Sequence, residues 1–441
     1  MNIHSLLGLT TWRAFDVDAH GRVLAGSDSS GSMQLVELEP DGTPTALTAL
    51  PGACSGRYLP EQRAVLVSHD EGGNERWQIS LLRLDSPLEE PASLQDLQPV
   101  VADPRYVHTL SEVRGGRIVY HTNRRNGVDF DVIIHNLATG EELTGYDGGG
   151  MVTESALSQD SRYLAVSRPA GAANSSQLLL VDMMPETPEQ ALRELSGFTE
   201  AAKHVSPCWS AGDGDLLVTC NSARDFTSIA RYSITTAELS WLVTAEGHDL
   251  TGAPSPDGSA LLVASAVDGH SELAIHRLED GAKITDIALG ESNWLGYPFP
   301  APVFSPDSRY VAVTLSAPDR PGDVALIDVA AAELRWLTDS TAPLRGTALS
   351  TPAVHRIDGR IPCFVYPPST AVEALAGASV MLIHGGPEGQ SVLAFHPVLQ
   401  GLAAAGFAVL VPNVRGSEGY GKAWYSADDV DLRFNAIDDM A

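Results

Sequence analysis

The chain has 441 residues, of which 44% are hydrophobic and 19% charged, the balance of a folded globular protein that is too long for one ordinary core. Its 56 acidic residues outnumber its 28 basic residues and give a formal net charge of −28. Such a surface repels phosphate backbones and argues against nucleic-acid binding. It could favour cationic groups such as peptide amino termini, although solubility is the simpler explanation.

The N-terminus and the cysteines carry no clear targeting or metal-binding signal. The chain does not start with basic residues before an apolar run, and it has no stretch of eighteen apolar residues. Cys54, Cys208, Cys220 and Cys363 match no metal-ligand spacing; Cys208 and Cys220 could meet across a hairpin, but buried thiols are the simpler prediction. We therefore expect a cytoplasmic protein without membrane contact, metal or cofactor.

A repeated unit fills residues 1–347. Its clearest copies start at Ser158, Ser206, Ser255 and Ser305, which are 48, 49 and 50 residues apart. Each copy opens with a turn of the Ser-Pro-Asp-Gly type, followed by two short apolar strands that are separated by polar turns. Weaker copies near residues 16, 59 and 112 raise the number to seven. Units of this length with about four strands predict an all-β, seven-bladed β-propeller.

Three features of this repeat allow a functional or a structural interpretation. Residues 69–76 contain ligand-type side chains that could hold a metal or an amine, and residues 123–129 could bind an anion. Both segments also have the composition of polar hairpin turns, which is the simpler interpretation. Trp209, Trp241 and Trp336 recur at similar points of their units, which indicates packing between blades rather than ligand stacking.

Residues 348–441 have an alternating strand and helix pattern. Residues 354–368 predict a hairpin that turns at Asp358 and Gly359. A buried strand is expected over residues 380–383, a helix over 392–405, a second strand over 407–412 and the start of another helix within 428–441. The turn His384-Gly385-Gly386-Pro387 follows the first of these strands, and the loop Arg415-Gly416-Ser417-Glu418-Gly419-Tyr420-Gly421 follows the second.

Seven repeats, the Asp-Gly hairpin, the HGGP turn and the RGSEGYG loop together resemble the prolyl oligopeptidase family of serine peptidases, in particular its acylaminoacyl-peptidase and dipeptidyl-peptidase-like branch. The resemblance covers the whole chain. It implies a propeller over 1–347, followed by the N-terminal part of an α/β-hydrolase domain over 348–441. It also implies that the propeller limits access to short peptides.

The resemblance assigns roles to individual residues. Gly386 matches the glycine whose backbone N–H stabilises the oxyanion, with Gly385 and Pro387 in the same turn. His384 matches the histidine that shapes this turn and is not the catalytic base. The loop that contains Arg415, Gly416, Ser417 and Tyr420 matches the floor of the site, for which a structural role is the simpler expectation. Asp438 and Asp439 match an acidic pair that opens the helix before the nucleophile strand.

The catalytic triad itself is missing from the sequence. No serine lies in the G-x-S-x-G pattern of a nucleophile elbow; Ser271 lacks the last glycine and Ser417 lacks the first. The family spacing puts the elbow, and after it the catalytic aspartate and histidine, beyond Ala441. We therefore expect these 441 residues to be a C-terminally truncated, inactive part of a serine peptidase that hydrolyses short peptides or aminoacyl and acylaminoacyl amides through an acyl-enzyme.

Two other functions remain open at this point. The chain could be a non-catalytic propeller that binds a peptide or a protein partner, although an incomplete hydrolase sheet would leave an open edge. The same scaffold could also serve an esterase, because a fold does not fix a substrate. The sequence indicates neither the oligomeric state nor the preferred residue at the cleavage site.

Overall fold

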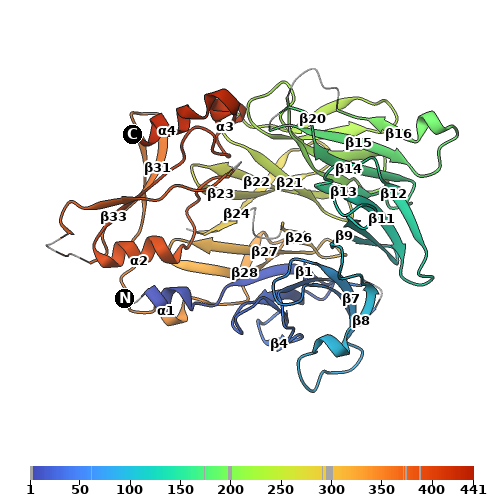
Figure 1. Cartoon of the computed structure of the whole chain (residues 1–441), viewed down its shortest axis with the longest axis horizontal. Helices are drawn as coiled ribbons and strands as arrows, with labels where there is room; N and C mark the ends of the chain where they lie inside the picture. Colours follow the sequence, from blue (N-terminus) through green and yellow to red (C-terminus); the bar gives the residue numbers. More distant parts are fainter. Residues whose placement is uncertain are drawn as a thin grey trace.

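The computed structural model describes residues 3–60, 62–172, 174–196, 201–290, 292–294, 301–370, 372, 375–386 and 389–441. Its architecture is dominated by β-sheets, most of them antiparallel and four-stranded (Figure 1). This confirms the prediction of a β-rich chain that is built from four-stranded units.

Within the described residues, seven sheets follow one another between residues 12 and 336. In each of the first six, neighbouring strands in the sheet are also neighbours in sequence, because every strand turns back beside the one before it. The strands of the first three sheets are β1 (Trp12–Val17), β2 (Val23–Ser27), β3 (Gln34–Leu38) and β4 (Pro44–Ala46); β5 (Cys54–Tyr58), β6 (Ala64–His69), β7 (Gln78–Arg83) and β8 (Gln98–Val101); and β9 (His108–Arg114), β10 (Arg117–Thr122), β11 (Asp131–Asn136) and β12 (Glu142–Tyr146).

The next four sheets repeat this plan, with an additional short strand, β26, paired with β27 in the last of them. Their strands are β13 (Glu154–Leu157), β14 (Tyr163–Pro169), β15 (Ser176–Asp182) and β16 (Leu192–Glu194); β17 (His204–Trp209), β18 (Asp215–Cys220), β19 (Ser228–Ser233) and β20 (Leu239–Val243); β21 (Leu250–Pro254), β22 (Ala260–Val267), β23 (His270–Arg277) and β24 (Lys283–Ile287); and β25 (Asn293–Trp294), β26 (Val303–Phe304), β27 (Tyr310–Ala317), β28 (Arg320–Asp328) and β29 (Glu333–Trp336).

These sheets close a ring. Each sheet contacts the next one along the chain, and β1 of the first also contacts β27 and β28 of the last. The first strands of neighbouring sheets contact one another, as β1 does with β5 and β13 with β17, so they lie nearest the axis of the ring. A single sheet cannot cover both of its faces, and closure into a ring gives every sheet two neighbours.

The hydrophobic core is divided among the junctions between sheets. One cluster lies at each junction; the one that closes the ring joins Ala14 and Val17 of the first sheet to Ala312, Val324 and Leu326 of the seventh. All five side chains are at most 2% exposed. Since a fully buried valine or leucine contributes about 1.5–3 kcal/mol, each junction can hold two sheets together without a central core.

A recurring turn connects the first and second strands of several sheets. In the turn that starts at Ser305, the Ser305 hydroxyl donates to Asp307 Oδ1 at 2.6 Å and accepts from the Tyr310 backbone N–H at 2.9 Å. Ser158 and Ser255 make the same two contacts in their own turns. The sequence predicted that the fourth copy of this turn starts at Ser206, and this was wrong. The copy starts at Ser210, whose N–H bonds the Asp215 carbonyl and whose hydroxyl contacts the backbone of the same residue.

The two segments with alternative interpretations form turns between strands. Residues 70–77 connect β6 to β7, and residues 123–130 connect β10 to β11. Arg125 pairs with Asp131 at 2.9 Å, and Arg124 pairs with Glu142. Trp209 lies in the cluster between the fourth and fifth sheets, which agrees with its predicted packing role. The four cysteines are free thiols.

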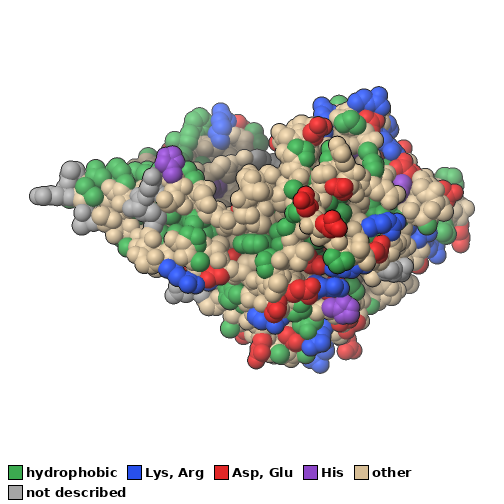
Figure 2. All heavy atoms as spheres, turned by 90° about the horizontal axis from the view of Figure 1, so that it is seen from below, with side chains coloured by type: hydrophobic (Ala, Val, Ile, Leu, Met, Phe, Trp, Pro, Cys, Tyr) green, Lys and Arg blue, Asp and Glu red, His purple; other side chains and the backbone are tan. Residues whose placement is uncertain are grey.

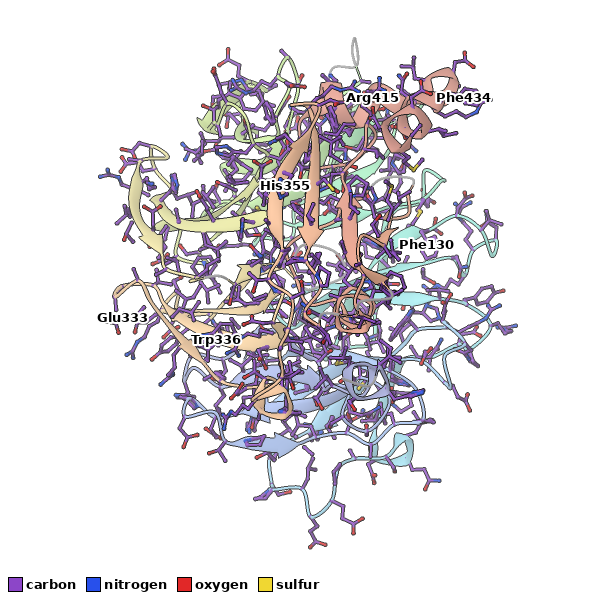
Figure 3. All side chains as sticks on the ribbon, turned by 90° about the vertical axis from the view of Figure 1, so that its left-hand side faces the viewer. Phe130, Glu333, Trp336, His355, Arg415 and Phe434 are labelled. Carbon is purple, nitrogen blue, oxygen red and sulfur yellow. The ribbon has the colours of Figure 1, made fainter. Side chains whose placement is uncertain are left out.

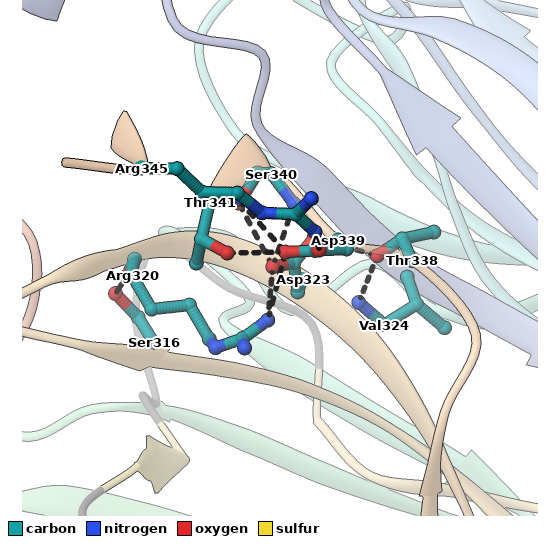
Figure 4. A network of polar contacts seen from close by, with 9 residues as sticks. All are labelled: Ser316, Arg320, Asp323, Val324, Thr338, Asp339, Ser340, Thr341 and Arg345. Atoms are coloured by element: carbon teal, nitrogen blue, oxygen red, sulfur yellow. Dashed lines mark hydrogen bonds and ion pairs between the residues drawn. The ribbon is translucent and has the colours of Figure 1, made fainter. Parts of the chain in front are cut away.

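A buried carboxylate fixes the exit from the ring. Asp323 is fully buried and accepts hydrogen bonds from the Thr338 hydroxyl at 2.7 Å and the Ser340 hydroxyl at 2.8 Å, and it pairs with Arg320 at 2.8 Å (Figure 4). The Val324 backbone N–H donates to the Thr338 hydroxyl as well. These contacts anchor the chain where it leaves β29, and the short helix η3 (Ala342–Leu344) follows.

The C-terminal sheet has the order β30 (Ala353–Ile357), β31 (Ile361–Tyr366), β33 (Ala408–Pro412) and β32 (Ser379–Met381). β30 and β31 form the predicted hairpin, with Asp358 and Gly359 both at positive φ in its turn. β32 and β33 are parallel. A cluster that contains Phe364, Leu399 and Val411 packs helix α2 (Pro397–Ala405) against this sheet.

The N-terminal helix α1 (Ile3–Leu7) contacts α2, so both ends of the chain lie on the same side of the ring (Figure 1). Ile3 packs so closely against Gly401 that a Cβ at that glycine would lie 2.6 Å from the Ile3 Cδ1. Helix α1 therefore packs beside helix α2 of the C-terminal part, although it is the first element of the chain.

Two predicted elements of this region were wrong in extent. The helix expected over 392–405 begins only at Pro397, because His396 caps it and proline is suited to a first helical position. The strand expected over 380–383 ends at Met381 and is not buried: it is an edge strand, and Met381 and Ile383 are each 41% exposed.

The acidic pair Asp438–Asp439 does not open a helix. Helix α4 (Phe434–Met440) begins four residues before Asp438, so the pair lies inside it. The residues that precede α4 form two short 3₁₀ turns, η5 (Ser426–Asp428) and η6 (Val430–Leu432).

Candidate active site

The predicted turn lies directly after the edge strand β32. The Leu382 N–H still bonds the Leu410 carbonyl at 2.9 Å, and the chain then leaves the sheet at His384. Gly385 and Gly386 are exposed, and a Cβ added to Gly385 would meet no atom within 4 Å. The glycine pair therefore leaves its backbone open to a ligand. Pro387, also a predicted site residue, lies outside the described residues.

His384 has a hydrogen-bond partner at each ring nitrogen. Its Nδ1 lies 3.0 Å from the Gly385 carbonyl oxygen and its Nε2 lies 2.7 Å from the Ser417 hydroxyl. A carbonyl can only accept, so Nδ1 carries a proton, and in the tautomer with its proton there Nε2 accepts from the Ser417 hydroxyl. Both ring nitrogens of His384 are thus engaged, one within the turn and one with the loop that contains Ser417.

Ser417 supports this turn from inside the molecule. Its side chain is fully buried, its N–H bonds the Val414 carbonyl at 3.0 Å, and the adjacent Gly416 N–H bonds the Trp424 carbonyl at 3.0 Å. A serine next to a histidine can be a nucleophile, but a fully buried hydroxyl cannot reach a substrate. Ser417 is therefore a positioning residue for His384.

Arg415 joins this loop to helix α4. Its Nε and Nη2 donate to the two oxygens of Asp439 at 2.9 and 2.8 Å, and its backbone N–H donates to Asp439 Oδ2 at 2.9 Å. Arg360 in the turn between β30 and β31 reaches the same carboxylate at 3.0 Å. Burial opposes ionisation of Asp439, but the Arg415 hydrogen bonds outweigh it and lower the pKa of Asp439. In Figure 3, Arg415 and Phe434 lie together at one end of the C-terminal part.

Tyr420 stabilises the other end of the loop. Its hydroxyl accepts from the Asn413 side-chain amide at 2.9 Å, and Asn413 also bonds both the N–H and the carbonyl of Ser391. Burial raises the pKa of Tyr420 to about 12, so the phenol stays protonated at neutral pH. Tyr420 thus fixes the chain around the site and does not act there as a base.

The far side of the loop meets the ring at a cavity of about 870 Å³. Gln390, Glu418 and Tyr425 line it from the C-terminal part, and Glu154 and Asp249 are among the residues that line it from the ring. Burial raises the pKa of both of these ring carboxyls. A space of this size between two parts of a chain is typical of a ligand site.

Lys203 is a cavity residue that the sequence interpretation missed. Its Nζ pairs with Glu418 Oε1 at 2.6 Å and lies 4.5 Å from the centre of the Tyr425 ring. The Tyr425 hydroxyl accepts from the Asn221 amide at 2.9 Å, which adds a second contact between the loop and the ring. No motif contains Lys203; its rarity as one of three lysines was the only available signal.

The structure thus brings together His384, Gly385, Gly386 and Ser417 around the turn, and it places Arg415 and Tyr420 as supports on either side. In the ranges described, no group of three His, Cys, Asp or Glu side chains is arranged to hold a metal ion. None of the helices in those ranges is long and apolar enough to cross a membrane.

The chain is thus a β-rich protein with a glycine turn beside a four-stranded C-terminal sheet, and comparisons with known proteins show what it is similar to. Residues 393–441 match the model of the prolyl oligopeptidase family. This match agrees with the family that the two motifs predicted; it includes the RGSEGYG loop, whereas the HGGP turn precedes the matched residues.

Solved structures with the same fold extend the similarity to nearly the whole chain. A puromycin-hydrolysing peptidase of Mycobacterium tuberculosis is 18% identical, with a TM-score of 0.75 over 97% of this chain and 70% of that one. A puromycin hydrolase is 17% identical, with a TM-score of 0.73 over 96% and 70% of the two chains. Prolyl oligopeptidase B of Galerina marginata is 13% identical, with a TM-score of 0.72 over 99% and 66%.

Proposed function

We propose that this chain is part of a serine-type peptidase of the prolyl oligopeptidase family, which hydrolyses short peptides or aminoacyl and acylaminoacyl amides. In this proposal residues 1–347 are a seven-bladed β-propeller, and residues 348–441 are the N-terminal part of an α/β-hydrolase domain. The closed ring of sheets, the family match over residues 393–441 and the similar peptidase structures support it.

One observation carries the proposal: the glycine turn after β32 has an exposed backbone and is held from behind by His384 and Ser417. A turn of the HGG type supplies backbone N–H groups to the oxyanion of a tetrahedral intermediate. Gly386 is the residue we assign to this role. Each such donor is worth about 3–4 kcal/mol in the transition state, because it is fixed before the charge develops.

The nucleophile, the acid and the general base of the proposed triad are not among these 441 residues. We propose that they come from sequence of the same gene product outside this chain, and that the 441 residues alone do not hydrolyse substrate. In the complete enzyme the serine attacks the amide carbonyl, the amine leaves, and water then hydrolyses the acyl-enzyme.

The substrate class follows from the cavity and the relatives. A cavity of about 870 Å³ that is closed on one side by the ring favours short substrates over folded proteins. Two of the similar structures are described as hydrolysing puromycin, a compound that contains an aminoacyl amide bond. We therefore propose aminoacyl amides as the first substrates to test.

The test uses the product of the complete gene, assayed with puromycin, aminoacyl-anilides and aryl esters. We expect hydrolysis of the amides. Replacement Ser417→Ala should lower kcat by on the order of tenfold or more with little change in KM, because the oxyanion donors act in the transition state.

Ser30→Ala, at an exposed serine of the ring, is the matched control and should leave both constants unchanged. Hydrolysis of esters without amides would make the protein an esterase. A folded product that hydrolyses neither class would contradict the proposal and favour a binding protein.

A further inference from the structure

The ring holds a second cavity, of about 920 Å³, which nothing in the proposed function uses. Six of the seven sheets line it, among others through Arg57, Glu112, Cys208, Pro256 and Phe304. Only the axis of the ring is shared by so many sheets, so this cavity lies on the axis.

The axial cavity opens on the face away from the C-terminal part. It is lined by turns that connect first and second strands, such as those around Ala19 and Pro306. The C-terminal part contacts the opposite turns instead: the Leu393 N–H bonds the Gly269 carbonyl between β22 and β23, and the Lys422 N–H bonds the Asp225 carbonyl between β18 and β19. The axial cavity is therefore separate from the turn at His384.

Four arginines line the axial cavity, and three of them are neutralised by contact. Arg22 pairs with Asp18 at 2.7 Å, Arg114 pairs with Glu112 at 2.5 Å, and Arg63 pairs with Glu37. Arg57 lies on the inner strand β5, where its backbone pairs with β6. Its side chain is half-buried and makes no hydrogen bond or ion pair with any residue that the structure describes.

Asp16 is close enough to Arg57 for their charges to interact, but both of its carboxylate oxygens already accept hydrogen bonds from backbone N–H groups. Asp16 Oδ1 accepts from the Val17 N–H and Oδ2 from the Tyr58 N–H, both at 2.8 Å. Burial raises the pKa of Asp16, and the charge of Arg57 offsets this only in part. Arg57 thus presents a guanidinium that lacks a contact ion pair inside a partly enclosed space, where charge interactions are stronger than in water.

We propose that Arg57 is a binding site for a carboxylate that enters the axial cavity, either the C-terminal carboxylate of a peptide or an acidic side chain. A guanidinium offers two parallel N–H groups that match the two oxygens of a carboxylate. Pro256, Pro306 and Phe304 provide apolar walls for the rest of the ligand. A phosphate dianion fits less well, because Asp16, Asp18 and Glu112 also line the cavity.

The test is calorimetric titration of the 441-residue chain with three short peptides, and it requires no hydrolysis. The first is acetyl-tetra-alanine with a free C-terminal carboxylate, the second is its C-terminal amide, and the third is an amide with one alanine replaced by aspartate. We expect the first to bind and the second not to bind. If the third peptide also binds, the site accepts any carboxylate. If the third peptide does not bind, the site is restricted to the C-terminal carboxylates of peptides.

Variants assign the binding to Arg57. Arg57→Gln should weaken the affinity at least tenfold, and Arg57→Lys should restore it only in part, because lysine lacks the planar pair of donors. The matched control is Arg83→Gln, which removes an exposed arginine of the same sheet that does not line this cavity.

Thermal unfolding of each variant shows whether it is folded. The proposal is overturned if the three peptides bind equally, if none binds, or if folded Arg57→Gln binds as well as the wild type. Because binding alone is measured, an inactive peptidase would leave this result unaffected.

Discussion

At the scale of single residues, the contact between Arg415 and Asp439 is the best-defined link between the loop and helix α4. Asp439 has a fully buried side chain and binds two arginines, of which Arg415 contributes two parallel hydrogen bonds. The sequence predicted a structural role for Arg415 in the loop, but nothing in it indicated that Asp439 was the partner. The two are 24 positions apart, and only the fold brings them together.

Asp439→Asn should destabilise the protein by about 2 kcal/mol, because it leaves Arg415 partly buried without a charged partner. Urea unfolding followed by circular dichroism measures the change. Asp286→Asn is the matched control: it breaks an exposed pair with Lys283 and should cost less than about 0.5 kcal/mol. Equal effects of both substitutions would contradict the role of Asp439.

The same pair predicts a pH dependence with a definite sign. The pKa of Asp439 is lowered on folding, so its contribution is complete above the ordinary aspartate range and is lost as the pH falls through the folded pKa. The difference in stability between the wild type and Asp439→Asn should therefore be constant from about pH 5 to 7 and shrink below about pH 4. A difference that grows on acidification would contradict this assignment.

At the scale of elements, the serine turn recurs between the first and second strands of several sheets of the ring. Ser305 is fully buried and satisfies the Tyr310 N–H at the start of β27. Ser305→Ala should cost about 1–2 kcal/mol, since it leaves a backbone donor without its partner. Thermal unfolding measures this cost, and the exposed Ser30→Ala should be neutral. A neutral Ser305→Ala would show that the turn motif is not part of what stabilises the sheet.

The sequence predicted the turns at Ser158, Ser255 and Ser305 and the C-terminal hairpin correctly, because each depends on residues that are close together in the chain. Ser305, Asp307 and Tyr310 lie within six positions. The burial of β32 was predicted wrongly for the opposite reason: whether an apolar strand is buried depends on its neighbours in the sheet, and β32 has only β33 beside it. The apolar pattern of residues 380–383 is the same whether the strand is buried within the sheet or lies at its edge.

The start of α2 and the fourth repeat show a limit of local patterns too. Apolar residues from Val392 onwards fit a helix, but the Leu393 N–H bonds the Gly269 carbonyl of the ring and the Phe395 N–H bonds the Ser316 hydroxyl. These long-range contacts hold the segment outside the helix, which begins only at Pro397. Likewise, Ser206 and Ser210 both precede a turn in the sequence, and only the hydrogen bonds distinguish them.

At the scale of the whole molecule, the C-terminal part is held on the ring by polar contacts at its loop. The Lys422 N–H bonds the Asp225 carbonyl at 2.8 Å and the Ala423 N–H bonds the Asp225 carboxylate at 2.7 Å. Figure 2 shows charged side chains of both signs spread over the ring side of the lower face and hydrophobic ones gathered toward the tapered end. The cavity with Lys203 and Glu418 lies beside these polar contacts.

Gly421→Ala should loosen this attachment. Gly421 has a φ of +86°, and a Cβ there would lie 2.8 Å from Asp225 Oδ2. Hydrogen exchange in residues 415–425 should therefore become faster. Gly377→Ala is the matched control. Gly377 has a similar φ of +80°, but an added Cβ there would meet no atom within 4 Å, so this substitution adds only the strain of a left-handed backbone conformation. Identical exchange in the two variants would show that close packing on the ring does not hold the loop.

The proposal that the glycine turn serves a nucleophile outside these 441 residues is tested most directly by labelling with a fluorophosphonate probe, followed by peptide mass spectrometry. The 441-residue chain should carry no label at any serine, Ser417 included. The product of the complete gene should carry one label, on a serine of a G-x-S-x-G elbow. Stoichiometric labelling of a serine within residues 1–441, or a folded complete product without any label, would contradict the account.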